Sequence, residues 1–171
     1  EMTSSLVGSE MCKETVINPT IIFTAYCIAT HNITIGLIEV FSFLLIRKYC
    51  GGYHCQSSTV CLIFSAIILI VMAWLSSFIK PSLYMFIALV IADVELIIKG
   101  PVISVNHSVS DSEKKYYHRC LVGILAVFNI IIIAATVLHL YRTASCISIV
   151  IIFCFISHIA CMTEKNRKLY Y

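Results

Sequence analysis

A polar stretch between long apolar segments carries the residues whose types could support nucleophilic chemistry. His54 and Cys61 lie seven residues apart in it, and Gly51 and Gly52 precede them. A thiol becomes a good nucleophile when a nearby histidine or cation favours its thiolate form, and the same stretch begins with Arg47. The spacing therefore predicts a thiolate nucleophile at Cys61 that is assisted by His54.

The backbone between the histidine and the cysteine must bend if the two side chains are to meet. On one continuous α-helix they would be about 10.5 Å apart along the axis, which is too far for proton transfer. A helix with Ser58 as its N-cap would place Cys61 in the first turn and leave His54 in the preceding loop. The positive end of the helix dipole would then favour the thiolate.

The composition of the chain indicates an integral membrane protein. Of its 171 residues, 60% are hydrophobic and only 12% are charged, and the mean hydropathy is +0.95. A soluble globular domain has far fewer apolar residues. We expect one membrane domain that comprises residues 1–171. The chain has no nucleotide, flavin or metal motif, so we expect no cofactor and no nucleic-acid partner.

Six apolar segments predict an all-α, polytopic bundle of transmembrane helices. The segments are residues 16–31, 33–46, 60–79, 83–98, 120–138 and 144–162. The third, fifth and sixth have the length of about 20 residues that crosses the hydrocarbon core of a bilayer. The first two are shorter or interrupted, which leaves open that they are re-entrant or interfacial.

The cationic residues predict the orientation of the bundle. They form three basic clusters: Arg47 with Lys48, the loop at residues 99–119, and the C-terminal tail at residues 163–171. Between these clusters lie only Lys80 and Arg142. If all six segments cross, the clusters share one side, which the positive-inside rule makes cytoplasmic. We therefore expect a multi-pass protein of the cell membrane with both termini and the catalytic loop, residues 47–61, in the cytoplasm.

The central stretch resembles the accessory gene regulator protein B (AgrB) family, the membrane endopeptidases that process quorum-sensing propeptides in Gram-positive bacteria. The family has the pattern of Arg, four residues, Gly, one residue, His, six residues and Cys. Arg47, Gly52, His54 and Cys61 meet this pattern. The loop after the fourth apolar segment is similar as well, and the resemblance covers roughly residues 46–122.

The resemblance implies a cysteine endopeptidase that cleaves an AgrD-type precursor of an autoinducer peptide. Cys61 would form a thioester acyl-enzyme, while His54 would take the thiol proton and later protonate the leaving amine. Capture of the thioester by a cysteine or serine of the peptide would close a thiolactone or a lactone. The resemblance also implies a homodimer in the membrane of a Gram-positive bacterium.

Other polar residues are candidates to support this reaction. They are Arg47, Gly52, Gln56 and Ser58 near the nucleophile, Glu39, Asp93 and Glu95 at membrane depth, and Lys114, Lys115 and Arg119 for an acidic part of the precursor. Gln56 or Ser58 could donate to the oxyanion, and a carboxylate could orient His54. Structural alternatives are a topology anchor for Arg47, ion pairs for the carboxylates, and contact with anionic membrane lipid for the basic loop.

Two other classes of function stay open on the sequence. Cys50, His54, Cys55 and Cys61 could bind a soft metal in a small membrane metal-binding or transport protein, although their spacing is unlike a standard zinc site. The third class is a non-catalytic membrane scaffold. We expect structural roles for the histidines that lack ligand spacing, which are His107, His118, His139 and His158.

Overall fold

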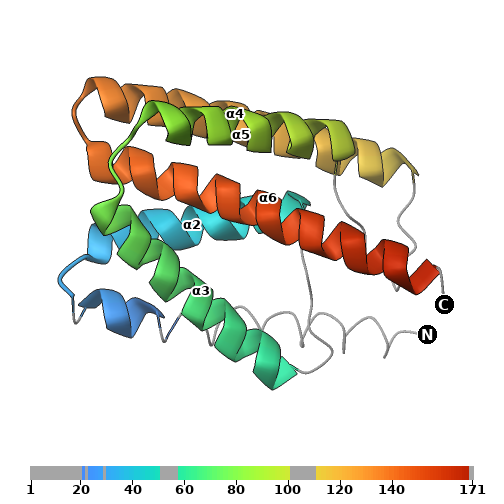
Figure 1. The fold of residues 1–171 in the computed structure, drawn as a ribbon, viewed down its shortest axis with the longest axis horizontal. Coiled ribbons are helices and arrows are strands. Elements are labelled where there is room, and N and C mark those ends of the chain that lie inside the picture. Colours follow the sequence, from blue (N-terminus) through green and yellow to red (C-terminus); the bar gives the residue numbers. More distant parts are fainter. Residues whose placement is uncertain (1–20, 22, 29, 51–57, 101–110, 170–171) are drawn as a thin grey trace.

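The computed structural model describes residues 21, 23–28, 30–50, 58–100 and 111–169, and this part of the chain is helical without a strand (Figure 1). Residues 23–28 form a short helix. The longer helices are α2 (Ile33–Cys50), α3 (Ser58–Phe78), α4 (Leu83–Lys99), α5 (Asp111–Val137) and α6 (Tyr141–Leu169). The predicted all-α class is therefore confirmed.

Local sequence explains where α4 begins and ends. The Ser82 side chain accepts a hydrogen bond from the backbone N–H of Met85 at 3.4 Å, which is the usual role of an N-cap serine. At the other end, Gly100 has a φ of +66° and its N–H donates to the carbonyl of Leu96. Glycine adopts this left-handed conformation without steric cost, so the helix ends there.

Helix α6 is the centre of the bundle and packs against α2, α3, α4 and α5. Figure 1 shows it between the pair α4 and α5 on one side and the pair α2 and α3 on the other. Its buried face includes small residues, Ala144, Ser145 and Ser148, beside Ile147 and Ile151. Small side chains let helix backbones approach closely, which is how helices associate in membranes.

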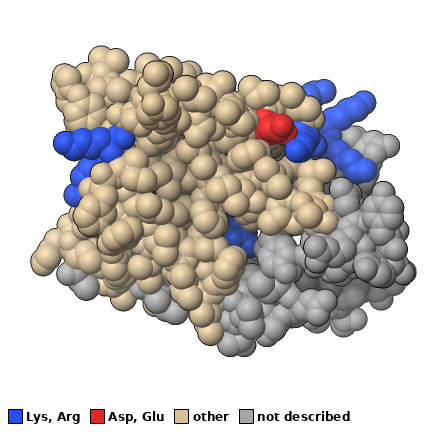
Figure 2. Space-filling view, in the orientation of Figure 1, with Lys and Arg blue, Asp and Glu red and all other residues tan. Residues whose placement is uncertain are grey.

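The basic residues of the described helices lie at the two ends of the bundle. The end of α2, the end of α4 and the start of α5 meet at one end, and they carry Arg47, Lys48, Lys99, Lys114, Lys115 and Arg119. Lys80 and Arg142 lie at the opposite end, where α3 ends and α6 begins. Figure 2 shows cations at the left and right ends of this face, a further cationic patch low in the centre, and one acidic patch toward the right end.

Helices α5 and α6 extend into two regions that we had assigned to a loop and a tail. Helix α5 begins at Asp111, so residues 111–119 of the predicted basic loop are helical, and α6 continues to Leu169 within the predicted tail. Acidic residues at a helix start, such as Asp111 and Glu113, and cations in its last turns are favourable to the helix dipole. The charged ends therefore extend these helices.

Two described helices are long and apolar enough to cross a membrane, Ser112–Val137 in α5 and Tyr141–Thr163 in α6, and Ile63–Phe78 in α3 is a shorter apolar stretch. This is fewer than the six predicted spans. Helices α2 and α4 have 18 and 17 residues and three charged side chains each. The apolar stretch of α3 is counted only from Ile63 onward, and the first predicted segment lies partly outside the described residues. Large apolar side chains are exposed on α3, α4 and α5, as expected for helices in contact with lipid.

Candidate functional site

The predicted nucleophile lies in the first turn of a helix. Helix α3 begins at Ser58, which makes Cys61 its fourth residue. Ser58 is thus the first helical residue instead of the predicted N-cap, a difference of one position. The first backbone N–H groups of a helix and the positive end of its dipole favour a thiolate or an oxyanion at such a position.

The other predicted members of the catalytic loop, Gly52, His54 and Gln56, lie outside the described residues. The pairing of His54 with Cys61 therefore stays a prediction. The structure describes the two helices on either side of residues 51–57. Helix α2 includes residues 47–50 of the predicted catalytic loop, and α3 includes residues 58–61.

The last turns of α2 hold the chain firmly where it enters the catalytic loop. Ile46 and Cys50 are completely buried, so they anchor one face of the helix in the core. The Arg47 guanidinium carbon lies 5.5 Å from the centre of the Phe43 ring, in cation–π contact. Cys50 is thus a packed core thiol, and Arg47 packs against Phe43 on the same helix.

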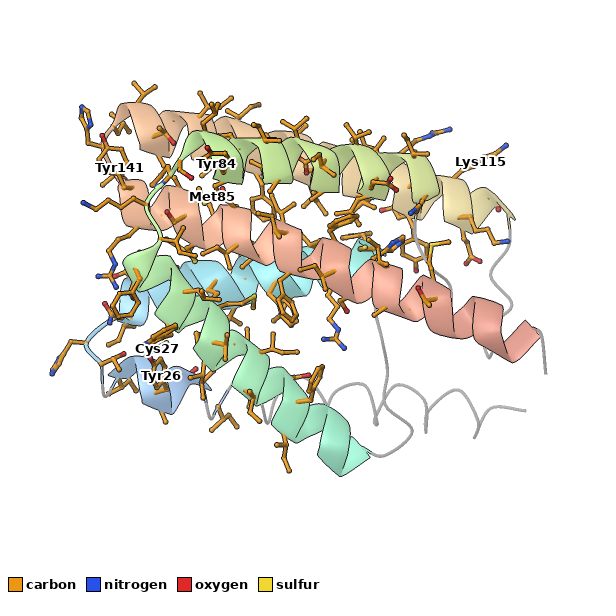
Figure 3. The ribbon with its side chains drawn as sticks, viewed as in Figure 1. Tyr26, Cys27, Tyr84, Met85, Lys115 and Tyr141 are labelled. Atoms are coloured by element: carbon orange, nitrogen blue, oxygen red, sulfur yellow. The ribbon has the colours of Figure 1, made fainter. Side chains whose placement is uncertain are left out.

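The predicted substrate-binding cations project from the start of α5. Lys114, Lys115 and Arg119 are exposed, and Figure 3 shows Lys115 pointing away from the bundle at this end. The rings of Tyr49 in α2 and Tyr117 in α5 lie 6.0 Å apart. This contact places the basic turns of α5 at the same end of the molecule as the helix that leads into the catalytic loop.

The three predicted carboxylates lie in separate environments. Glu39 is fully buried, and its Oε2 lies 3.9 Å from the Cys146 Sγ. Glu39 precedes the last residue of α2 by eleven residues, which is about 16 Å along the helix axis. Asp93 and Glu95 lie on α4, and each contacts a different side chain. The structure therefore does not gather these carboxylates into one site.

Asp93 and Glu95 each make one direct polar contact with a side chain. The Nδ2 of Asn129 in α5 donates to Asp93 Oδ2 at 2.8 Å, and Glu95 forms an ion pair of 2.8 Å with Lys99 one turn later. The ion pair agrees with the structural alternative for Glu95. Asn129 was not predicted from the sequence, because a single asparagine in an apolar helix gives no sign of which carboxylate it meets.

Two of the histidines contact the end of α4. His118 lies 2.8 Å from the carbonyl oxygen of Ile97, and His158 lies 2.9 Å from that of Gly100. Both contacts are to backbone, as expected of histidines in structural positions. Sequence reasoning did not foresee that two helices would bring them to the same helix end.

Within the described part of the chain, no three His, Cys, Asp or Glu side chains form a group that could hold a metal ion. Of the four residues in the metal-binding alternative, Cys50 is the one whose side chain is described, and it is buried in the core. The other three are His54, Cys55 and Cys61, so the structure adds no support for this alternative.

The family model AgrB, described as accessory gene regulator B, matches residues 8–161 of this chain. No curated protein and no solved structure matches it. The family match extends the similarity from roughly residues 46–122 to most of the chain. It includes all of α2 to α5 and most of α6.

Proposed function

The chain belongs to the accessory gene regulator B family, which is associated with the processing of quorum-sensing propeptides, and we propose that it is a membrane-embedded cysteine endopeptidase of this pathway. The observation that carries the proposal is the family match over residues 8–161 together with the Arg47, Gly52, His54 and Cys61 pattern inside it. The start of α3 at Ser58 supports it, because the nucleophile then lies at a helix N-terminus.

The reaction we propose is an acyl transfer in two steps. The Cys61 thiolate attacks the carbonyl carbon of the scissile peptide bond, and N–H groups at the start of α3 stabilise the oxyanion. Gln56 or the Ser58 hydroxyl adds a further donor. The intermediate collapses to a Cys61 thioester as His54 protonates the leaving amine, which releases the C-terminal fragment of the precursor.

A thiol or hydroxyl of the bound peptide then attacks the thioester carbonyl. His54 takes the proton of this thiol or hydroxyl, a new thioester or ester bond closes the ring, the bond to Cys61 breaks, and the Cys61 thiolate is regenerated. The exchange of one thioester for another is nearly balanced in energy, so it needs proximity and the exclusion of water. A site embedded among membrane helices would suit that requirement.

The substrate we propose is an AgrD-type precursor with an acidic C-terminal part. Lys114, Lys115 and Arg119 are exposed at the end of the bundle from which the catalytic loop departs. Their charges would concentrate an acidic peptide there. By the positive-inside rule this end faces the cytoplasm of a Gram-positive cell, with the protein as a multi-pass homodimer in its membrane.

Co-expression with such a precursor tests the proposal. The wild-type chain, Cys61→Ala and His54→Ala are each expressed with the precursor, and the fragments are weighed by mass spectrometry. We expect both variants to lose cleavage while remaining in the membrane. Cys120→Ala is the matched control, because Cys120 is a partly exposed thiol at the same end of the bundle and should not be needed. Undiminished cleavage by Cys61→Ala would contradict the proposal.

A further inference from the structure

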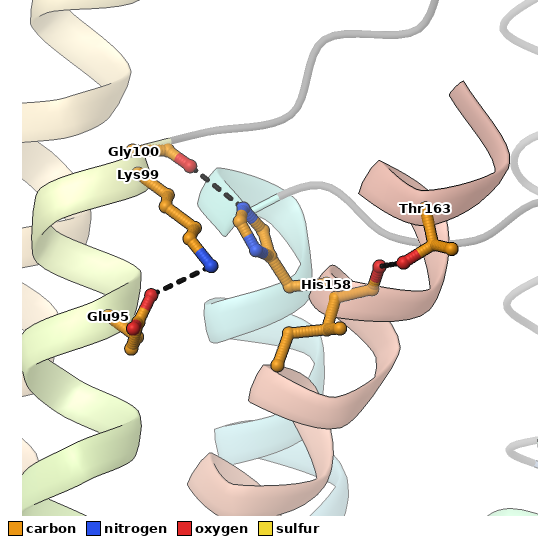
Figure 4. Close-up of polar contacts among 6 residues, drawn as sticks. Glu95, Lys99, Gly100, His158 and Thr163 are labelled. Carbon is orange, nitrogen blue, oxygen red and sulfur yellow. Dashed lines mark hydrogen bonds and ion pairs between the residues drawn. The ribbon is translucent and has the colours of Figure 1, made fainter. Parts of the chain in front are cut away.

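The end of α4 is held by three hydrogen bonds to carbonyl oxygens. The carbonyl of Leu96 accepts from the N–H of Gly100 at 3.0 Å. The carbonyls of Ile97 and Gly100 are bonded by the Nε2 atoms of His118 in α5 and His158 in α6, at 2.8 and 2.9 Å. Figure 4 shows the bond between His158 and Gly100. Because a carbonyl can only accept, both Nε2 atoms carry the hydrogen and donate it.

The packing around Gly100 is close. A Cβ atom at this position would lie 3.2 Å from the Cδ2 of His118, and the positive φ already disfavours a larger residue. His158 is 1% exposed, so its ring has no room to leave the carbonyl without moving α6. We call the two histidines with the end of α4 the histidine clamp.

The histidine clamp links the two parts of the proposed active end. His118 lies one turn after Lys115, so the orientation of its ring and that of the exposed cations depend on the same turns of α5. Cys154, one turn before His158 in α6, and Cys50 at the end of α2 are both buried in the same core cluster. The contacts thus run from the start of α5, through the end of α4 and α6, to the end of α2.

From this geometry we propose that His118 and His158 are positioning residues, which hold the basic first turns of α5 in place relative to the end of α2. The inference rests on the proposed function, because it takes those cations to bind the acidic part of the precursor. The two histidines touch no reacting group in it. A change in the clamp should therefore weaken capture of an acidic substrate and leave the chemical step intact.

A purely structural role for the clamp makes a different prediction. Carbonyl groups at a helix end need donors where water is scarce, so the histidines could serve stability alone. Loss of stability would lower the amount of active enzyme and reduce cleavage of every precursor equally. The dependence on substrate charge separates the two roles.

The test compares two synthetic precursors, one with its acidic C-terminal part and one in which each Asp and Glu there is replaced by Asn or Gln. The variants are His158→Leu and His118→Leu, which remove the donor, and His158→Gln, whose amide N–H can still reach the carbonyl. The control is His139→Asn. His139 is exposed at the opposite end of the bundle at a positive φ that asparagine tolerates.

We expect each leucine variant to raise KM for the acidic precursor about three- to tenfold, as the loss of one directional hydrogen bond would. Its kcat should stay near that of the wild type, and its KM for the neutralised precursor should change little. The His158→Gln variant should recover most of the affinity, and His139→Asn should behave as the wild type.

Equal losses on both precursors, or a fall in kcat alone, would overturn the positioning role. The same holds if neither leucine variant changes KM. If His158→Leu does not insert into the membrane, His118→Leu and the comparison of His158→Gln with wild type decide the question. A wild-type chain that cuts neither precursor would be a distinct result, since it contradicts the proposed peptidase itself and the inference with it.

Discussion

At Gly36, the short helix at residues 23–28 packs closely against α2. A Cβ atom added to Gly36 would clash with the Sγ of Cys27 and lie 3.1 Å from its Cβ and 3.5 Å from a ring carbon of Phe23. Cys27 and Phe23 are 4% and 1% exposed, so neither side chain can move into open space. We predict that Gly36→Ala lowers the free energy of unfolding.

A second helical glycine provides the scale for this effect. At Gly123 in α5, no described atom other than those of its chain neighbours and its own helix backbone lies within 4 Å of the position where its Cβ would be. Replacing a glycine by alanine in a helix interior gains up to about 1 kcal/mol at either site. Overpacking costs about 1–3 kcal/mol and applies at Gly36 alone. Gly36→Ala should therefore be less stable than Gly123→Ala by about that amount.

The assay is equilibrium unfolding in mixed micelles with increasing SDS, followed by far-UV circular dichroism. The double variant Cys27→Ala with Gly36→Ala should regain part of the loss, because removal of the sulfur atom leaves space for the new methyl group. The reasoning would be refuted if Gly36→Ala were as stable as Gly123→Ala. It would also fail if the double variant were no better than the sum of the two single changes.

Two further predictions concern polar contacts between helices. Asn129→Leu removes the donor to Asp93 at membrane depth and should lower the free energy of unfolding by about 1–3 kcal/mol. The double variant Asn129→Leu with Asp93→Leu should recover most of the lost free energy of unfolding in the same assay. Equal stability of Asn129→Leu and wild type would contradict the contact. Arg142→Gln loses bonds of 3.0 and 3.1 Å to the loop before α2 and the end of α3, and should cost about 1 kcal/mol. Lys80→Gln is the control for Arg142→Gln, because Lys80 is an exposed cation at the same end and its replacement should change stability by about 0.5 kcal/mol or less. Indistinguishable unfolding midpoints for Arg142→Gln and Lys80→Gln would disprove a role for the Arg142 bonds.

The predicted number of spans is confirmed only in part. The sequence predicted about six crossing segments, whereas length and composition support two among the described helices. Apolar runs can be recognised without a structure, but a carboxylate inside a run has an effect that depends on its partner. Asp93 accepts a hydrogen bond from Asn129, 36 residues away, and no periodic pattern in the sequence predicts that pair.

The local features of this protein could be derived from the sequence by itself. The all-helical class, the limits of α4 at Ser82 and Gly100, and the helix start near Ser58 depend on neighbouring residues, whose capping and dihedral preferences act over a single turn. The pattern that includes His54 and Cys61 can also be recognised from the sequence, since it lies within one short segment.

The tertiary structure alone decided which distant groups meet. Glu39 lies beside Cys146, 107 residues later, and two helices bring His118 and His158 to the end of α4. Such contacts follow from the packing of helices around α6. Small residues and the rotation of each helix about its axis determine which side chains become neighbours. Hydropathy analysis of the sequence shows that a helix contains a polar residue, but it does not show which group that residue contacts. The contact depends on how helices that are far apart along the chain are rotated and crossed.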